Sequence, residues 1–268
     1  MNAPAVRYER DGDVAIATLD APARMNPLSQ AVQQGLRDVI LQVHEDRSVR
    51  ALVLTGEGRG FCVGADLSAM GPSTEGDARS VGERTAQRMR EIGNPLILAL
   101  RDLPVPLLCA VNGVCAGAGV GMALAADVVI AAKSAYFYLP FIPKLGIVPD
   151  LGTTWFLQRL AGRGRALALS LLGDRLSAEQ AADWGVTWAA VEDAALREQA
   201  LLLAHRLASL PAHGVIEARR AYDAAASNSL SAQLDYEADR QRELLDKPSF
   251  AEGARAFMEK REPRFDGR

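Results

Sequence analysis

Residues 105–132 read VPLLCAVNGVCAGAGVGMALAADVVIAA, with two apolar runs on either side of a glycine-rich segment. The first run, 105–113, ends in Asn-Gly and predicts a buried strand. The small residues after it predict a tight turn and a helix, and 128–132 predicts another buried strand. Strand, helix and strand in this order, with strands that are apolar throughout, are typical of a parallel βαβ unit. This segment therefore predicts an α/β fold.

The same alternation continues toward the N-terminus. Apolar runs around Asp-Gly-Asp predict a hairpin, and an amphipathic pattern that opens at Ser29 predicts a helix. Residues 68–84 are polar and contain glycine, and we interpret them as a mobile loop. The expected elements before residue 105 are hairpin strands at 6–10 and 14–20, a helix at 29–44, a strand at 49–56 and a helix that ends near residue 100. The apolar face of the first helix consists of Val32, Leu36, Val39, Ile40 and Val43.

From Ser177 onward the chain shows helical patterns only. Ser177-x-x-Gln180 predicts a capping box, and Ser249-x-x-Glu252 predicts the start of the last helix in the same way. Longer helices are expected at 193–209, 212–226, 231–245 and 249–261. We expect an α/β core with the ligand site over residues 1–190 and a helical C-terminal region over 191–268. The residue identities show no repeat with a period of about 20–50 residues.

The composition is that of a soluble globular protein. Of 268 residues, 49% are hydrophobic and 24% are charged, and the formal net charge is −3. Because both signs are scattered along the chain, nucleic acid is not expected as a partner. No apolar run reaches the roughly 18 residues that a membrane span needs, and the N-terminus lacks the features of a secretory signal. We therefore expect a cytoplasmic protein without a membrane partner.

The cysteines and histidines do not suggest a metal site. The cysteines lie in apolar or glycine-rich runs and predict reduced core residues: Cys62, Cys109 and Cys115. No pair of cysteines has the spacing of zinc ligands, and the histidines are scattered: His44, His205 and His213. This pattern argues against metal binding and against a Ser-His-Asp triad.

Two glycine-rich elbows follow predicted strands and lead into predicted helices. They are GRGFCVGADL at 58–67 and NGVCAGAGVG at 112–121. Tight packing of a helix on a strand explains either elbow alone about as well as ligand binding does. Two elbows on adjacent strands, however, would direct two free N–H groups at one ligand, which is the minimal oxyanion hole.

Asp150 stands in GIVPDLGTT at 146–154, among apolar residues and glycine. Pro-Asp followed by glycine is ordinary turn chemistry, and that reading is the simpler one from local sequence. An aspartate that is buried near Ile147, Val148 and Leu151 would instead have a raised pKa and be an effective base.

Segments spread in order over nearly the whole chain resemble the enoyl-CoA hydratase/isomerase (crotonase) superfamily. They are RMNPLS at 24–29, GEGRGFCVGADL at 56–67, AVNGVCAGAGVGMALAADVVIA at 110–131, LGIVPDLGTTWFLQRLAG at 145–162, LSAEQAADWGV at 176–186 and AFMEKREPRF at 256–265. The resemblance implies a spiral of βαβ units with an α-helical C-terminal region that mediates trimerisation. It also implies a homotrimer or a hexamer made of two trimers. The implied substrate is a coenzyme A thioester, so no separate cofactor is expected.

The resemblance also implies where such a substrate would bind. The thioester oxygen would lie between the N–H groups of Ala65 and Ala118. The implied coenzyme A-binding residues are Arg24 and Arg59 near the phosphates, Val63, Asp66 and Leu67 in the adenine pocket, Gly64 and Gly117 at the elbows, and Phe257 and Lys260 from a neighbouring subunit. Solvated surface charge explains Arg24 and Arg59 about equally well, and core packing at helical spacing explains Phe257 at least as well.

The catalytic positions distinguish members of the family. Hydratases of the family use two glutamates, and the matching positions in the acyl pocket hold Gly121 and Phe141, which cannot transfer a proton. Isomerase-type members carry a catalytic aspartate where this chain has Asp150. The resemblance therefore implies an acyl-CoA isomerase that shifts a double bond or opens a ring epoxide, as in phenylacetate or fatty-acid degradation.

Other functions compete with isomerisation. Loss of both glutamates is also compatible with a hydratase that has an atypical site, or with a non-catalytic acyl-CoA-binding protein. An RNA-binding role is disfavoured by the net charge, and a purely structural trimer would have no need of two elbows. The dehalogenase branch of the family needs a histidine downstream of the first elbow and a tryptophan before the aspartate. Here no histidine lies between His44 and His205, and the tryptophan position holds Ile142. The sequence does not identify the acyl group, because the acyl pocket is expected to be built largely from the mobile region 68–100.

Overall fold

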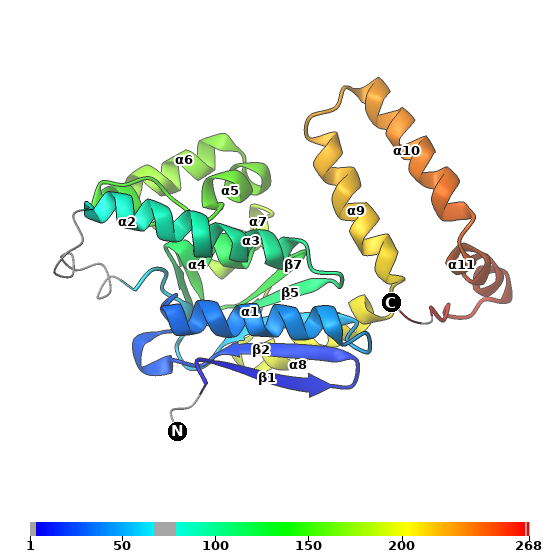
Figure 1. The fold of residues 1–268 in the computed structure, drawn as a ribbon, viewed down its shortest axis with the longest axis horizontal. Coiled ribbons are helices and arrows are strands. Elements are labelled where there is room, and N and C mark those ends of the chain that lie inside the picture. The colour runs from blue at the N-terminus through cyan, green and yellow to red at the C-terminus, as the bar shows by residue number, and fades with distance from the viewer. Residues whose placement is uncertain (1–3, 67–78, 266, 268) are drawn as a thin grey trace.

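The structure, a computed structural model, describes residues 4–66, 79–265 and 267. Strands and helices alternate up to β10, and only helices follow, which confirms the predicted α/β class and helical C-terminal region (Figure 1). The strands are β1 (Val6–Asp11), β2 (Val14–Leu19), β3 (Ala51–Gly56), β4 (Gly60–Cys62), β5 (Leu107–Val111), β6 (Val114–Ala116), β7 (Val128–Ala132), β8 (Tyr136–Tyr138), β9 (Arg175–Ser177) and β10 (Ala189–Val191). The α-helices are α1 (Gln30–Glu45), α2 (Val81–Arg88), α3 (Asn94–Arg101), α4 (Ala118–Leu124), α5 (Thr153–Ala161), α6 (Arg163–Leu172), α7 (Ala178–Asp183), α8 (Leu196–Ala208), α9 (Ala212–Ala225), α10 (Leu230–Leu245) and α11 (Pro248–Glu259).

The strands form two sheets that the chain builds in alternation. The larger sheet has the order β1-β2-β3-β5-β7-β10 and the smaller one β4-β6-β8-β9. After β3 the chain adds β4 to the smaller sheet, and the pairs β5/β6 and β7/β8 repeat this step with parallel pairing. The result is the predicted spiral of βαβ units. Its repeat lies in the backbone geometry rather than in residue identity, so the sequence alone does not reveal it.

Helices cover the larger sheet. All residues of β2 are buried, which requires apolar cover on both faces of that strand. The helix α8 packs against β2, β3, β5 and β7, and α1 packs against β1, β2 and α3. The five predicted apolar residues of α1 are buried, and the Ser29 hydroxyl accepts a hydrogen bond from the Val32 N–H, as an N-cap does.

The outer strands of the larger sheet differ from the inner ones. The strand β1 is paired on one side only, with β2, and its exposed residues include Glu9 and Arg10. Arg7 of β1 bonds to Asp20 at 2.6 Å and to Glu57 at 2.7 Å. At the other edge, β10 has three residues. These two strands end the sheet.

The segment before α3 corrects one expectation. Residues 68–78 of the predicted mobile loop lie outside the described residues. From Val81 the loop prediction is wrong, because Ser80 and Glu83 form a reciprocal capping box that starts α2. A π-helical segment, Met89–Gly93, then connects α2 to α3 without a break.

The last three helices extend away from the α/β core as an arm (Figure 1). Arg219 of α9 anchors the arm to the core, because its guanidinium bonds to Asp127 at 2.6 Å and to the Val105 carbonyl at 2.9 Å. The predicted Ser249 cap of α11 is wrong: the helix begins at Pro248, and the Ser249 hydroxyl lies 3.2 Å from His213 Nε2. Glu252 instead bonds to Arg261 at 2.7 Å. On α11, Phe257 is 85% exposed and Met258 is 76% exposed.

Candidate active site

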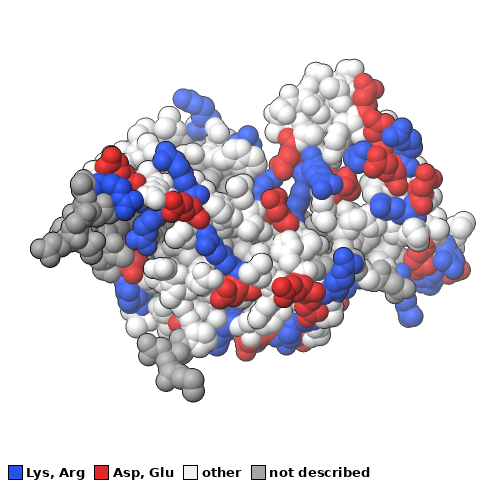
Figure 2. All heavy atoms as spheres, viewed as in Figure 1, with Lys and Arg blue, Asp and Glu red and all other residues white. Residues whose placement is uncertain are grey.

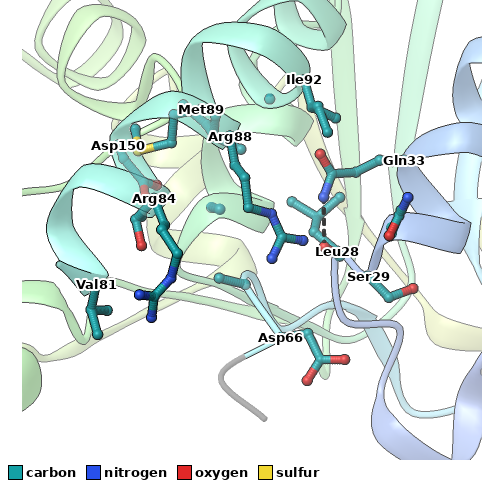
Figure 3. A pocket seen from close by; sticks show the side chains of 16 residues that line it. Leu28, Ser29, Gln33, Asp66, Val81, Arg84, Arg88, Met89, Ile92 and Asp150 are labelled. Carbon is teal, nitrogen blue, oxygen red and sulfur yellow. Dashed lines mark hydrogen bonds between the residues drawn. The ribbon is translucent and has the colours of Figure 1, made fainter. Parts of the chain in front are cut away.

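A pocket of about 310 Å³ lies between α1, α2, the two elbows and the turn before α5 (Figure 3). Four of the predicted site residues line it: Ala65, Asp66, Ala118 and Asp150. They come from three separate segments of the chain, around residues 65, 118 and 150, which the spiral brings to one place. The pocket therefore unites the first elbow, the second elbow and the predicted acid/base.

The two elbows pack against each other because their turns lack side chains. They contain β4 and β6, which are neighbours in the smaller sheet, and their turns follow these strands. A Cβ added to Gly64, which has φ +86°, would lie 2.9 Å from the Ala116 carbonyl oxygen and 2.9 Å from the Ala118 nitrogen. Gly117 has φ +54°, also in the left-handed region. Only glycine permits this approach at Gly64.

The N–H groups of Ala65 and Ala118 belong to these elbows. Ala118 is the first residue of α4, so its N–H has no acceptor within the helix. Within the described part of the chain, neither amide donates a backbone hydrogen bond outside regular elements. Both residues line the pocket.

Asp150 has a carboxyl group that is partly removed from water. Its Oδ1 is buried and has no hydrogen-bond partner among the described residues. Burial raises the pKa of the Asp150 carboxyl from 3.8 to about 6. The backbone of the next two residues is left-handed, with φ +45° at Leu151 and +81° at Gly152. A tight turn thus exists here, as the local sequence predicts, and it holds a perturbed carboxyl group.

The source of this burial differs from the prediction. Ile147 is 51% exposed and Val148 is 73% exposed, so these two side chains do not enclose the carboxyl group. Leu151 is the predicted neighbour that does line the pocket, together with Met89 and Gly93 of the π-helical segment. The apolar wall therefore comes from a distant part of the chain.

Two of the predicted coenzyme-binding residues bond to each other. The Arg24 guanidinium lies 2.6 Å from the Asp66 carboxylate at the pocket entrance. Arg59 is exposed, and Val63 is half-buried with its N–H bonded to the Met25 carbonyl at 3.2 Å. Leu67 lies outside the described residues.

The remaining predicted residues do not line this pocket. Gly121 packs against the Leu151 backbone, and Phe141 is 4% exposed within the hydrophobic core. Their assignment to the acyl pocket therefore stays a prediction. Phe257 on α11 and Lys260, which directly follows this helix, are exposed. Core packing of Phe257, the alternative from helical spacing, is wrong for this chain.

Sequence reasoning missed several polar side chains of the pocket. Gln33 comes from α1, and its amide donates to the Leu28 carbonyl at 2.9 Å. Arg84 and Arg88 come from α2, four residues apart, and extend toward the pocket in Figure 3. The capping box at Ser80 and Glu83 was the signal that could have revealed α2 and its inner face.

Asn26 is a further residue that sequence reasoning missed, and its hydrogen bonds support the first elbow. It is fully buried, and its amide nitrogen donates to the Gly60 carbonyl at 2.7 Å and to the Glu57 carbonyl at 3.0 Å. Its Oδ1 accepts from the Ala21 N–H at 2.8 Å. Asn26 therefore ties the turn before it to both ends of the β3–β4 connection.

Figure 2 shows basic and acidic side chains intermingled on the face viewed, rather than one sign of charge. No group of three or more His, Cys, Asp or Glu that could bind a metal ion occurs among the described residues. Within the same residues, no helix has the length and apolarity to cross a membrane.

Comparison with known proteins places this architecture in a family. The family model for enoyl-CoA hydratase/isomerase matches residues 9–268. The chain is 44% identical to 1,2-epoxyphenylacetyl-CoA isomerase of Escherichia coli over 255 residues, which cover 95% of each protein. It is 41% identical over 263 residues, 98% of each protein, to a Rhodobacter capsulatus protein named "Probable enoyl-CoA hydratase". A crystal structure of an enoyl-CoA hydratase from Polaromonas sp. JS666 has a TM-score of 0.89 at 30% identity and covers 97% of this chain and 99% of that one.

These matches extend over the α/β core and the helical arm together, and they confirm the crotonase-like spiral. The protein is an enzyme that belongs to the enoyl-CoA hydratase/isomerase family.

Proposed function

We propose that this enzyme is an acyl-CoA isomerase with Asp150 as its single acid/base. The Asp150 carboxylate removes a proton from the carbon next to the thioester, and the electron pair moves onto the thioester oxygen as an enolate. The N–H groups of Ala65 and Ala118 stabilise that oxygen. Protonated Asp150 then returns the proton to a carbon further along the conjugated chain, so the double bond shifts without net gain or loss of atoms.

One observation carries this proposal: both elbows line the pocket of Asp150, whose buried Oδ1 has no hydrogen-bond partner among the described residues. Burial raises the pKa of this carboxyl group to about 6, which is suited to accepting and returning a proton near neutral pH. Asp66 is the other carboxylate among the described residues of the pocket wall, and it pairs with Arg24. That pairing favours Asp150 as the base.

Isomerisation is favoured over hydration by the residues at two positions. Hydration needs a second group to activate water, and neither Gly121 nor Phe141 can do so. The name of the Escherichia coli relative also favours isomerisation, of a ring epoxide in that protein. The Rhodobacter capsulatus relative bears a hydratase name, which keeps hydration with an atypical site as the second candidate.

The proposal includes the substrate and the assembly. Coenzyme A enters as part of the substrate, with Arg24, Arg59 and Asp66 near the pocket entrance, and no separate cofactor takes part. In a homotrimer or a hexamer, Phe257 and Lys260 on the arm of a neighbouring subunit complete the coenzyme site.

Asp150→Asn tests whether Asp150 is the acid/base, because asparagine keeps the size of the side chain but cannot accept the proton. We expect isomerase turnover on a 3-enoyl thioester or an epoxyphenylacetyl thioester to fall by about 10²–10⁴-fold, with little change in acyl-CoA affinity. Asp102→Asn, at the exposed end of α3, is the matched control and should leave turnover unchanged. Robust hydration of crotonyl-CoA by the wild type that survives Asp150→Asn would instead establish the hydratase. Tight binding without turnover on any thioester would establish a binding protein.

A further inference from the structure

Gly121 lies on α4 one helical turn after Ala118, and its neighbour is the turn that carries Asp150. A Cβ built on Gly121 would lie 2.2 Å from the Leu151 carbonyl oxygen and 3.0 Å from the Leu151 carbonyl carbon. It would also lie 2.9 Å from the hydroxyl oxygen of Thr153, a residue that is 1% exposed. Contacts of 2.2 Å between a Cβ and backbone do not occur, so any side chain at residue 121 displaces this turn.

The opposite side of Leu151 meets a second glycine. A Cβ built on Gly93, in the π-helical segment, would lie 2.9 Å from Leu151 Cδ2. The turn is therefore held between α4, which contacts the Leu151 backbone, and the π-helical segment, which contacts its side chain. π-helical segments are frequent at functional sites, where the extra residue changes which side chains face inward.

The backbone of the turn shows why it needs such support. Leu151 has φ +45°, a left-handed conformation that a leucine adopts only under constraint from its surroundings. The Thr153 N–H closes the turn by donating to the Asp150 carbonyl at 2.9 Å. The Asp150 carboxyl group is therefore carried by a turn that Gly121 approaches at the Leu151 backbone and Gly93 approaches at the Leu151 side chain.

We propose that Gly121 and Gly93 are positioning residues that place the Asp150 turn against α4, and that this turn excludes a water-activating glutamate at residue 121. What the aspartate does there rests on the function proposed above. In this chain the glutamate of a hydratase and the aspartate turn of an isomerase compete for the same volume. The Asp150 site therefore requires that no glutamate stands at residue 121, so this absence is more than the loss of a hydratase site.

Gly121→Ala is the test, with Gly164→Ala on α6 as its control, because a Cβ at Gly164 meets nothing within 4 Å. We expect Gly121→Ala to lower kcat by about 10–100-fold, since a misplacement of about 1 Å has an effect of this order. Acyl-CoA affinity should change little, and the acid limb of the pH–rate profile should shift because the surroundings of Asp150 change. Gly93→Ala should have a smaller effect, because only the end of the Leu151 side chain has to move. Gly93→Ala also tests the positioning role if Gly121→Ala does not fold.

A crystal structure of Gly121→Ala provides a readout that does not depend on turnover. Displacement of residues 150–152 away from α4 is the expected result. An unmoved turn, unchanged kcat and an unchanged pH profile would overturn the positioning role. So would Gly121→Glu that gains crotonyl-CoA hydration while it keeps full isomerase activity. If Asp150→Asn itself retained turnover, the proposed function would fail, and the displacement of the turn would still be open to measurement.

Discussion

At the scale of the residue, the raised pKa of Asp150 predicts a pH-dependent effect on stability. The folded protein binds the proton of this carboxyl group more tightly than the unfolded chain, with pKa about 6 against 3.8. Its contribution to stability is therefore fully present below pH 3.8 and is lost as the pH rises through 6. Asp150→Asn removes the buried charge, so it should raise the free energy of unfolding at neutral pH.

We expect Asp150→Asn to increase the free energy of unfolding by about 1–2 kcal/mol at neutral pH. This is roughly half of what full burial would give, because the carboxyl group retains contact with water. Near pH 4 the gain should vanish, since the carboxyl group of the folded wild type is then neutral. Urea denaturation at both pH values and one protein concentration measures this difference. An equal gain at both would mean that the carboxyl group does not titrate as described.

Residues near Asp150 also show what the sequence could predict. The two elbows and Asp150 follow from glycine patterns and from the family resemblance, because those features are local. The wall around the carboxyl group was predicted incorrectly. Ile147 and Val148 are close in sequence but point into solvent, whereas Met89 and Gly93 reach the site from a helix that begins in the predicted loop. Proximity that arises from the spiral is not encoded in any one segment.

At the scale of the element, the first elbow depends on a polar anchor. Asn26 satisfies the carbonyls of Glu57 and Gly60 and the N–H of Ala21, all with one buried side chain. Asn26→Ala leaves these groups without a partner, and we expect a loss of about 2–4 kcal/mol in the free energy of unfolding. Asn94→Ala, at an exposed position on α3, should change it by less than about 0.5 kcal/mol.

Thermal or urea denaturation of both variants measures these losses, and acyl-CoA binding by Asn26→Ala shows whether the elbow is kept. A variant as stable as the wild type would show that water replaces the amide at no cost. The sequence marks Asn26 only as part of the motif RMNPLS. Its contacts with residues 31 and 34 positions further along could not be read from that motif.

At the scale of the whole molecule, the arm presents apolar side chains that the single chain does not cover. Phe257 and Met258 are largely exposed, although α11 is otherwise an amphipathic helix with Ala256 buried. If the arm packs on a neighbouring subunit, Phe257→Ala should raise the dissociation constant of the oligomer by about 10-fold or more, because burial of a phenylalanine contributes about 1.5–3 kcal/mol.

Light scattering over a dilution series measures the assembly. Leu41→Ala, at an exposed leucine of α1, is the control and should leave the mass unchanged. A Phe257→Ala protein that dissociates at the same concentration as the wild type would show that this face is not an interface.

The helices of the arm were predictable from their periodicity, but the direction in which they leave the core was not, because it depends on contacts such as that of Arg219 with Asp127.

The two edges of the larger sheet have a consequence for aggregation. A long, flat, apolar edge strand offers unpaired backbone groups to any other extended chain, and such pairing leads to fibrils. Here β1 carries charged side chains at that edge and β10 is too short to guide a partner strand. We therefore expect copies of this protein to remain in solution as discrete particles even at high concentration. Strand addition at the larger sheet is therefore disfavoured, and we expect chains that join there to do so through their helices.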